Sequence, residues 1–241
     1  MENSARDALS GGRWLDIAPE RTVSWLSAFA ARHGGAHVAP GAAAVRYMGA
    51  DGAIAECHVP FPPLPDMAAG SSATLPPPAL PPPALDPGEV AERIAAHAGA
   101  DRTVGVLIVR LGGYAAGVFT GAPPRLAASK TGSRLVHGRS AAGGTSQQRF
   151  ARRREKQAGQ ALSAAADAAL RVFDRYPRRL DAVVLGGDRL AIGRIREDER
   201  LRPYFELAVE RFLTVPEPRL AVLRDTPRLF RAVRIRLIEP T

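Results

Sequence analysis

Residues 138–156 read GRSAAGGTSQQRFARRREK, and they join a glycine-containing loop to a helix. Glycine adopts backbone angles that other residues avoid, so the pair in this stretch suits a narrow loop. Thr145 followed by Gln148 fits a capping box, which predicts that a helix starts here. Apolar residues then recur three, four or eight positions apart, and this spacing predicts one long helix over Gln147–Tyr176. We therefore expect an uncharged loop at the head of a long helix.

The first turns of this helix are strongly basic. Between positions 125 and 160 the chain has nine Lys and Arg residues and one acid, Glu155. The whole chain has a formal charge of +9 and a pI of about 10.8, so most of the excess charge lies in this region. Crowded like charges, and positive charge at a helix N-terminus, both destabilise a helix. An ordinary glycine turn before a solvated helix face would also fit, but a polyanion such as RNA would offset both costs.

We predict that these basic residues and a neighbouring histidine contact RNA. The predicted RNA-binding residues are Lys130, Arg134, His137, Arg139, Arg149, Arg152, Arg153, Arg154 and Lys156. His137 could instead act as a general base toward a ribose hydroxyl, but a phosphate contact or an exposed loop position suits it better.

Strand-like and helix-like segments flank the long helix. The predicted strands are 103–110, 114–120, 125–130, 181–185, 206–210 with 212–215, and 232–238. The last of these alternates polar and apolar residues like an edge strand, and residues 218–225 fit neither pattern. Gly186-Gly187-Asp188 lacks the spacing of a nucleotide-binding loop, so we interpret it as a strand-to-helix turn. The region 88–241 is therefore predicted to be an α/β domain with a mixed sheet.

A smaller unit is expected at the front of the chain. Ala18–His33 has helical spacing, and the runs 43–48 and 54–59 predict a hairpin. Eleven of the 21 prolines lie in residues 60–87, where they disfavour both helix and sheet. We predict a small α+β N-terminal unit at 1–60, a proline-rich linker at 61–87 and the main domain at 88–241.

Several classes of site and location are excluded by composition. Cys57 is the one cysteine, so the chain can form no internal disulfide and no cysteine zinc site. The five histidines show no metal-ligand spacing, and we expect no metal and no cofactor. No apolar run reaches the length of a membrane span, and the first residues do not resemble a signal peptide, which predicts a cytoplasmic protein without a membrane partner. We interpret Trp14 and Trp25 as core residues of the N-terminal unit.

The loop and the basic helix resemble the release-factor domain of the Vms-like release factors, a branch of the eukaryotic/archaeal-type peptide chain release factor superfamily. Members carry a Gly-Gly-Ser-Gln or Gly-Thr-Ala-Gln loop before a helix, and GGTSQ at 143–147 is similar. KTGSRLVHGRSAAGG at 130–144 and RFARRREKQAGQAL at 149–162 resemble the basic approach and the arginine-rich helix of that family. The resemblance covers about residues 100–241 and is strongest to an actinobacterial peptidyl-tRNA hydrolase branch. It implies a mixed-sheet fold like a release-factor catalytic domain.

The resemblance also implies an activity, which is codon-independent hydrolysis of peptidyl-tRNA on a stalled large ribosomal subunit. The implied partners are the large subunit, its ribosomal RNA and peptidyl-tRNA. The implied catalytic residues are those of the loop: Gly143, Gly144, Thr145, Ser146 and Gln147. General termination factors place glutamine directly after Gly-Gly, whereas two residues intervene here and Gln148 follows, so the register of the active glutamine stays open. A non-catalytic ribosome- or RNA-binding factor and a nuclease acting at the tRNA 3′ CCA end are alternatives.

Overall fold

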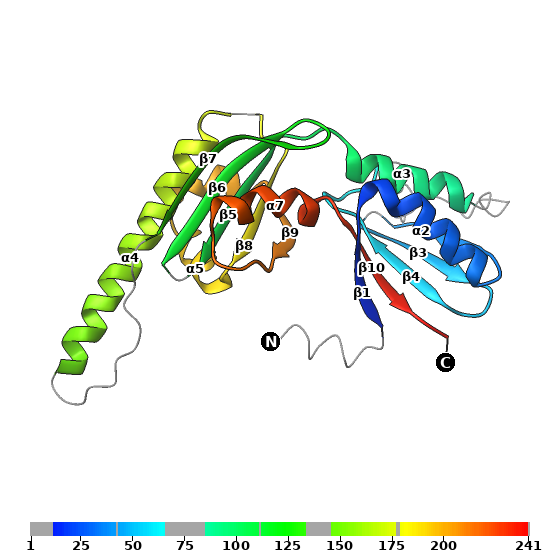
Figure 1. The fold of residues 1–241 in the computed structure, drawn as a ribbon, viewed down its shortest axis with the longest axis horizontal. Helices are drawn as coiled ribbons and strands as arrows, with labels where there is room; N and C mark the ends of the chain where they lie inside the picture. Colours follow the sequence, from blue (N-terminus) through cyan, green and yellow to red (C-terminus); the bar gives the residue numbers. More distant parts are fainter. Residues whose placement is uncertain are drawn as a thin grey trace, which may run out of the picture. The chain divides into compact units, whose positions relative to one another are not determined.

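The computed structural model describes residues 12–41, 43–65, 85–110, 112–133, 146–176 and 179–240, with the backbone alone for 146–154. The chain folds into two compact units, and each contains one five-stranded sheet (Figure 1). The first unit combines residues 1–100 with 231–241, and the second is 101–230. The fold is thus mixed α/β with two sheets, which confirms the predicted class.

The first unit is an antiparallel sheet with helices on one face. Its elements are β1 (Arg13–Ile17), α2 (Pro19–Arg32), β2 (Ala36–Ala39), β3 (Ala44–Gly49), β4 (Ile54–His58), α3 (Pro87–Gly99) and β10 (Val233–Ile238). The strand order is β1-β10-β4-β3-β2. In β3, β4 and β10, buried residues alternate with less buried ones, as Val45 and Tyr47 do in β3, and the buried residues pack with Phe29 of α2 and Ile94 of α3 in one core. The alternation therefore follows from a sheet with one covered face.

Two segments lie elsewhere than the sequence predicts. The strand predicted at 232–238 is not an edge strand, because β10 pairs with β1 on one side and β4 on the other. Its alternation of apolar and polar residues reflects the covered and uncovered faces of the sheet. The helix α3 also differs, since it belongs to the first compact unit although it lies in the predicted range 88–241. Tyr47 holds its start by donating a hydrogen bond of 2.8 Å to the Pro87 carbonyl.

The two tryptophans occupy different environments. Trp25 packs against the core of the first unit and stacks on Phe29 with ring centroids 6.0 Å apart, as expected for a core residue. Trp14 lies instead on the uncovered face of the sheet, because the neighbouring residues Leu15 and Arg13 take the other side of β1 and Leu15 joins the core. The interpretation of Trp14 as core is therefore wrong.

Cys57 offers a direct test of the first unit's core. Its side chain is fully buried, and burial raises the pKa of the thiol. A thiol reagent at pH 8 is therefore expected to modify the native protein far more slowly than the unfolded chain. The labelling rate should increase with urea as the first unit unfolds. Labelling of native protein at the rate of the unfolded chain would show that Cys57 is accessible and would contradict this core.

The second unit is a mixed sheet between two layers of helices. Its elements are β5 (Val104–Arg110), β6 (Gly113–Thr120), β7 (Arg125–Ser133), α4 (Ser146–Phe173), β8 (Ala182–Gly187), α5 (Arg189–Ile195), a 3₁₀ turn η2 (Glu199–Leu201), α6 (Arg202–Phe205), β9 (Ala208–Leu213) and α7 (Leu220–Phe230). The strand order is β7-β6-β5-β8-β9, with β5, β8 and β9 parallel and β6 and β7 antiparallel. The core between the sheet and α4 contains Ala165, Ala169 and Phe173 of the helix. On the other face, Phe230 of α7 meets Phe119 of β6 with centroids 5.7 Å apart.

Most of residues 218–225, which fit neither sequence pattern, lie in the helix α7. It contains Pro227, which has no N–H to donate to the carbonyl of Leu223 one turn earlier. The buried hydroxyl of Thr226 donates to that carbonyl instead, at 2.7 Å. The side chain thus replaces the missing backbone hydrogen bond, and the helix continues to Phe230.

Replacement of two glycines of the second unit by alanine is expected to change the stability of the protein in opposite directions. Gly187, the last residue of β8, has a φ of +95°, and a Cβ there would lie 2.1 Å from the Val109 carbonyl oxygen. Gly187→Ala is expected to destabilise the protein by at least about 2 kcal/mol. Gly159 lies in α4 with nothing within 4 Å of an added Cβ, so Gly159→Ala should add about 0.5–1 kcal/mol.

Urea unfolding followed by far-UV circular dichroism measures both free energies. Because each variant adds one methyl group, each is the matched control of the other. Equal effects from the two substitutions would contradict the backbone geometry at Gly187.

Candidate functional site

The predicted site lies where β7 ends and α4 begins. Lys130 is in β7, and Ser146, Gln147, Arg149, Arg152, Arg153, Arg154 and Lys156 are in α4. For the six residues from Ser146 to Arg154 in this set, the structure describes only the backbone. Arg134, His137, Arg139, Gly143, Gly144 and Thr145 lie outside the described residues. Both predicted glutamine positions, Gln147 and Gln148, therefore fall in the first turn of α4.

The helix α4 has two parts with different surroundings. Among its described side chains, those buried in the core run from Ala165 to Phe173, and Leu162 packs at the margin of that core. Nearer the N-terminus, Glu155, Lys156 and Gln160 are exposed, whereas residues 157–159 are half-buried and none of the described side chains before Ala165 is buried. Figure 1 shows these first turns extending past the end of the sheet. At about 1.5 Å per residue, the part from Ser146 to Leu162 is about 24 Å long. We call residues 146–161 the arm.

The packed part of α4 is well anchored. Small alanines at this end let the helix approach the sheet closely, and Phe173 contacts Tyr204 with ring centroids 5.2 Å apart. The Tyr204 hydroxyl donates to Asp174 at 2.5 Å, and burial, together with this hydrogen bond, raises the pKa of Tyr204 to about 12. Arg200 of η2 donates to Asp167 of α4 at 3.0 Å. The arm therefore extends from a fixed base.

The strand that leads into the site is an edge strand with a basic, polar surface. β7 pairs with β6 alone, and Lys130 lies opposite Ala116 in that pairing. A Cβ at Gly132 would lie 2.4 Å from the Tyr114 hydroxyl, so the close approach of that ring requires glycine there. Lys130 and Lys156 are both exposed, and in the described part of the chain neither forms an ion pair. Both ammonium groups are thus available to an anionic partner.

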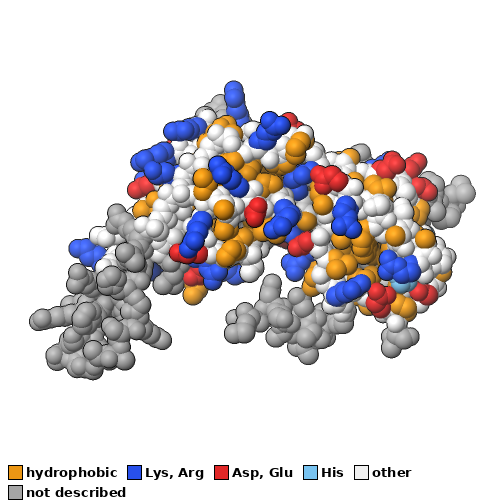
Figure 2. Space-filling model, in the orientation of Figure 1, with side chains coloured by type: hydrophobic (Ala, Val, Ile, Leu, Met, Phe, Trp, Pro, Cys, Tyr) orange, Lys and Arg blue, Asp and Glu red, His pale blue; other side chains and the backbone are white. Residues whose placement is uncertain are grey.

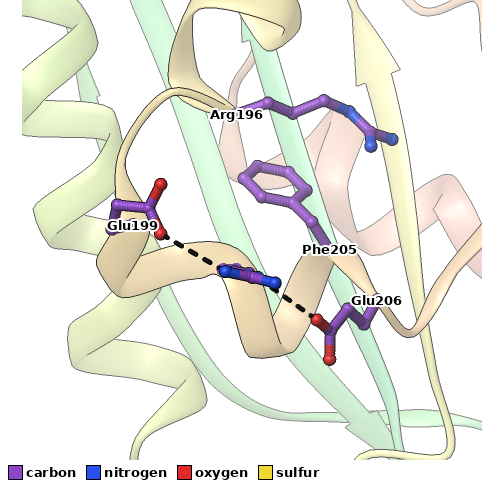
Figure 3. A pocket seen from close by; sticks show the side chains of 5 residues that line it. Arg196, Glu199, Phe205 and Glu206 are labelled. Atoms are coloured by element: carbon purple, nitrogen blue, oxygen red, sulfur yellow. Dashed lines mark ion pairs between the residues drawn. The ribbon is translucent and has the colours of Figure 1, made fainter.

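A separate hollow on the second unit is a weaker candidate. It has a volume of about 250 Å³ and is lined by Arg196, Glu199, Arg202, Phe205 and Glu206 (Figure 3). Arg202 lies 3.9 Å from Glu199 and 3.4 Å from Glu206, and Arg196 lies over the Phe205 ring. The two arginines and two glutamates largely neutralise one another, so the hollow has little net charge to attract a ligand. Exposed ion pairs of this kind also contribute little to stability. Within the described ranges, no three His, Cys, Asp or Glu side chains group as a metal site requires.

One comparison with known proteins identifies a family. Residues 102–236 match the model of a family described as Actinobacteria/chloroflexi VLRF1 release factor. No curated protein matches the chain. In the described part of the chain, no helix combines the length and the apolar character that crossing a membrane requires.

Two solved structures align with the chain at low similarity. The crystal structure of the archaeal translation termination factor aRF1 aligns with a TM-score of 0.39 and 11% identity, over 95% of this chain and 71% of that one. The Vms1 mitochondrial localization core aligns with a TM-score of 0.38 and 10% identity, over 88% of this chain and 80% of that one.

Proposed function

This chain belongs to the Actinobacteria/chloroflexi VLRF1 release factor family, and from that membership we propose that it is a ribosome-rescue peptidyl-tRNA hydrolase. The family indicates a ribosome-associated release function. We propose the finer statement that the protein hydrolyses the ester between a nascent peptide and the tRNA 3′ adenosine on a stalled large subunit, without reading a codon.

The observation that carries this proposal is the arm. The part of α4 that precedes its buried residues is a single helix about 24 Å long, which is slim enough to enter a channel in RNA. The catalytic group has to travel to the substrate, because peptidyl-tRNA is held inside the large subunit. The arm begins with the uncharged residues Ser146, Gln147 and Gln148, and arginines follow in its first turns. It would therefore bring an amide to the ester while its cations contact phosphates.

The chemistry requires little of the protein. A water molecule attacks the ester carbonyl carbon, the bond to the ribose oxygen breaks, and the water proton is transferred to that oxygen. The peptide leaves as a carboxylic acid. We propose that the Gln147 amide orients the water, because an amide donates and accepts hydrogen bonds without titrating. The N–H groups in the first turn of a helix have no acceptor one turn earlier in the same helix, so those of α4 are suited to the oxyanion that develops on the carbonyl.

The test is release from a defined stalled complex. Purified protein is added to large subunits that carry labelled peptidyl-tRNA, and both products are analysed. Free peptide together with tRNA that keeps its CCA end supports ester hydrolysis. A tRNA shortened at its 3′ end would identify a nuclease, and binding without release would identify a non-catalytic factor. Either of these results would overturn the proposed activity.

A further inference from the structure

The first unit has an uncovered sheet face that the proposed function does not use. In its described part, α2 and α3 both pack on the opposite face, where they bury residues such as Leu26 and Ile94. The uncovered face consists of the outward residues of β1, β10, β4 and β3, and we call it the open face. In Figure 2, basic and hydrophobic side chains lie side by side over β10 and β4.

The strand register arranges the open face in rows. One row across the strands is Trp14, Arg236, Glu56 and Arg46, and the next is Asp16, Arg234 and His58. A third row is apolar and contains Ile238, Ile54 and Met48. Cross-strand neighbours lie close enough for their side chains to interact. Aromatic rings and guanidinium groups are thus adjacent on the first two rows.

The contacts within these rows hold the planar groups in place. The guanidinium of Arg234 lies 4.3 Å over the Trp14 ring, and the His58 ring centroid lies 5.2 Å from that of Trp14. Glu56 is 16% exposed and lies between two guanidinium groups and an imidazole, with Arg46 at 3.4 Å, Arg236 at 4.0 Å and His58 at 3.8 Å. The carboxylate therefore orients the two arginines, while Arg46 remains 62% exposed. Groups fixed in this way lose little entropy when they bind a ligand.

We propose that the open face binds a single-stranded segment of RNA. Unstacked bases bind on aromatic rings and on guanidinium planes, and a helix-backed antiparallel sheet is a platform that presents both. Three arginines face two carboxylates, Asp16 and Glu56, so the first two rows have an excess of positive charge for phosphates.

The proposal is independent of the ester hydrolysis proposed for the arm. The open face belongs to the unit of residues 1–100 and 231–241, and the arm belongs to the unit of residues 101–230. Substitutions at Trp14 and Arg234 should therefore leave peptide release from saturated complexes unchanged.

A fluorescence titration tests the proposal in the full-length protein. Trp14 and Trp25 are the two tryptophans of the chain, so Trp25→Phe leaves Trp14 as the reporter. Arg152, Arg153 and Arg154 are replaced by alanine in the same protein to remove the RNA contacts proposed for the arm. Addition of a 12-nucleotide single-stranded RNA is expected to quench Trp14 by base stacking, and a duplex of equal length should bind more weakly. Unchanged Trp14 emission at saturating RNA, or equal affinity for the duplex, would overturn the proposal.

Substitutions provide a second, independent measurement in that arm-depleted protein. Trp14→Ala and Arg234→Ala should each weaken binding of a labelled single strand about fivefold or more. The milder substitution Trp14→Phe keeps an aromatic ring, so the affinity of this variant should lie between those of the two alanine variants and that of the parent. Arg93→Ala is the matched control, because it removes one exposed arginine from α3 on the covered side of the sheet. Equal affinities for parent, Trp14→Ala and Arg234→Ala would contradict the proposal.

Discussion

Gln147→Ala is expected to slow peptide release at least about 100-fold while ribosome affinity stays within about twofold. The magnitude follows from the loss of one positioned hydrogen-bonding group at the reacting atoms, which typically costs 100-fold or more. Affinity is preserved because the arginines, and not the amide, supply the contacts to phosphates. Single-turnover release from saturated large subunits measures the rate, and co-sedimentation measures the binding.

Gln148→Ala is the matched control for this prediction. Gln147 and Gln148 both lie in the first turn of α4, at helix positions about 100° apart. The two positions therefore cannot face the ester in the same way, and one substitution should retain most of the release activity. Full activity of Gln147→Ala would reject the role proposed for that amide. If Gln148→Ala were the inactive variant instead, the active glutamine would be one residue further along the helix.

The long helix and the strands around it could be predicted because their signals are local. The apolar spacing of α4 and the buried runs of β5 and β8 are each complete within one segment. β1 has five residues and β2 has four, so neither is long enough for a clear sequence pattern. They are strands because β1 pairs with β10 and β2 pairs with β3. The position of β10 inside the first sheet likewise depends on partners more than 170 residues away in sequence.

The basic arm could be predicted because its arginines and the nearby glycines cluster in sequence. The open face could not be predicted in this way, because strand pairing assembles it. The arginines of the arm are neighbours in the chain, so their density is visible directly. The open face combines Trp14 from one end of the chain with His58 and Arg234, and only strand register brings these residues together. A usable signal was present, since arginines alternate with apolar residues in the RIRLI run of β10, as on a sheet with one uncovered face.

Replacement of Arg152, Arg153 and Arg154 by alanine is expected to weaken binding to the large subunit at least about tenfold at physiological salt. The three positions are consecutive in α4 and lie about 100° apart around the helix, so they surround the arm instead of lining one side. If each contacts one phosphate, the slope of log affinity against log salt should fall by about 2–3. Release from complexes saturated with the variant should stay near the parent rate, because phosphate contacts position the arm and do not act on the ester. Binding measured between 50 and 300 mM salt determines the slope.

A second triple variant separates position from net charge. Arg171, Arg175 and Arg179 are exposed residues at and beyond the packed end of α4, and their replacement by alanine removes the same charge. This control should lose much less affinity, because short-range phosphate contacts, and not the overall field, dominate at salt concentrations where the Debye length is about 8 Å. Equal losses from the two triple variants would mean that ribosome binding depends on total charge alone, and the arm would then have no special role in RNA contact. A larger loss from the Arg152, Arg153 and Arg154 variant, with a reduced salt slope, requires that the arm itself lies among phosphates.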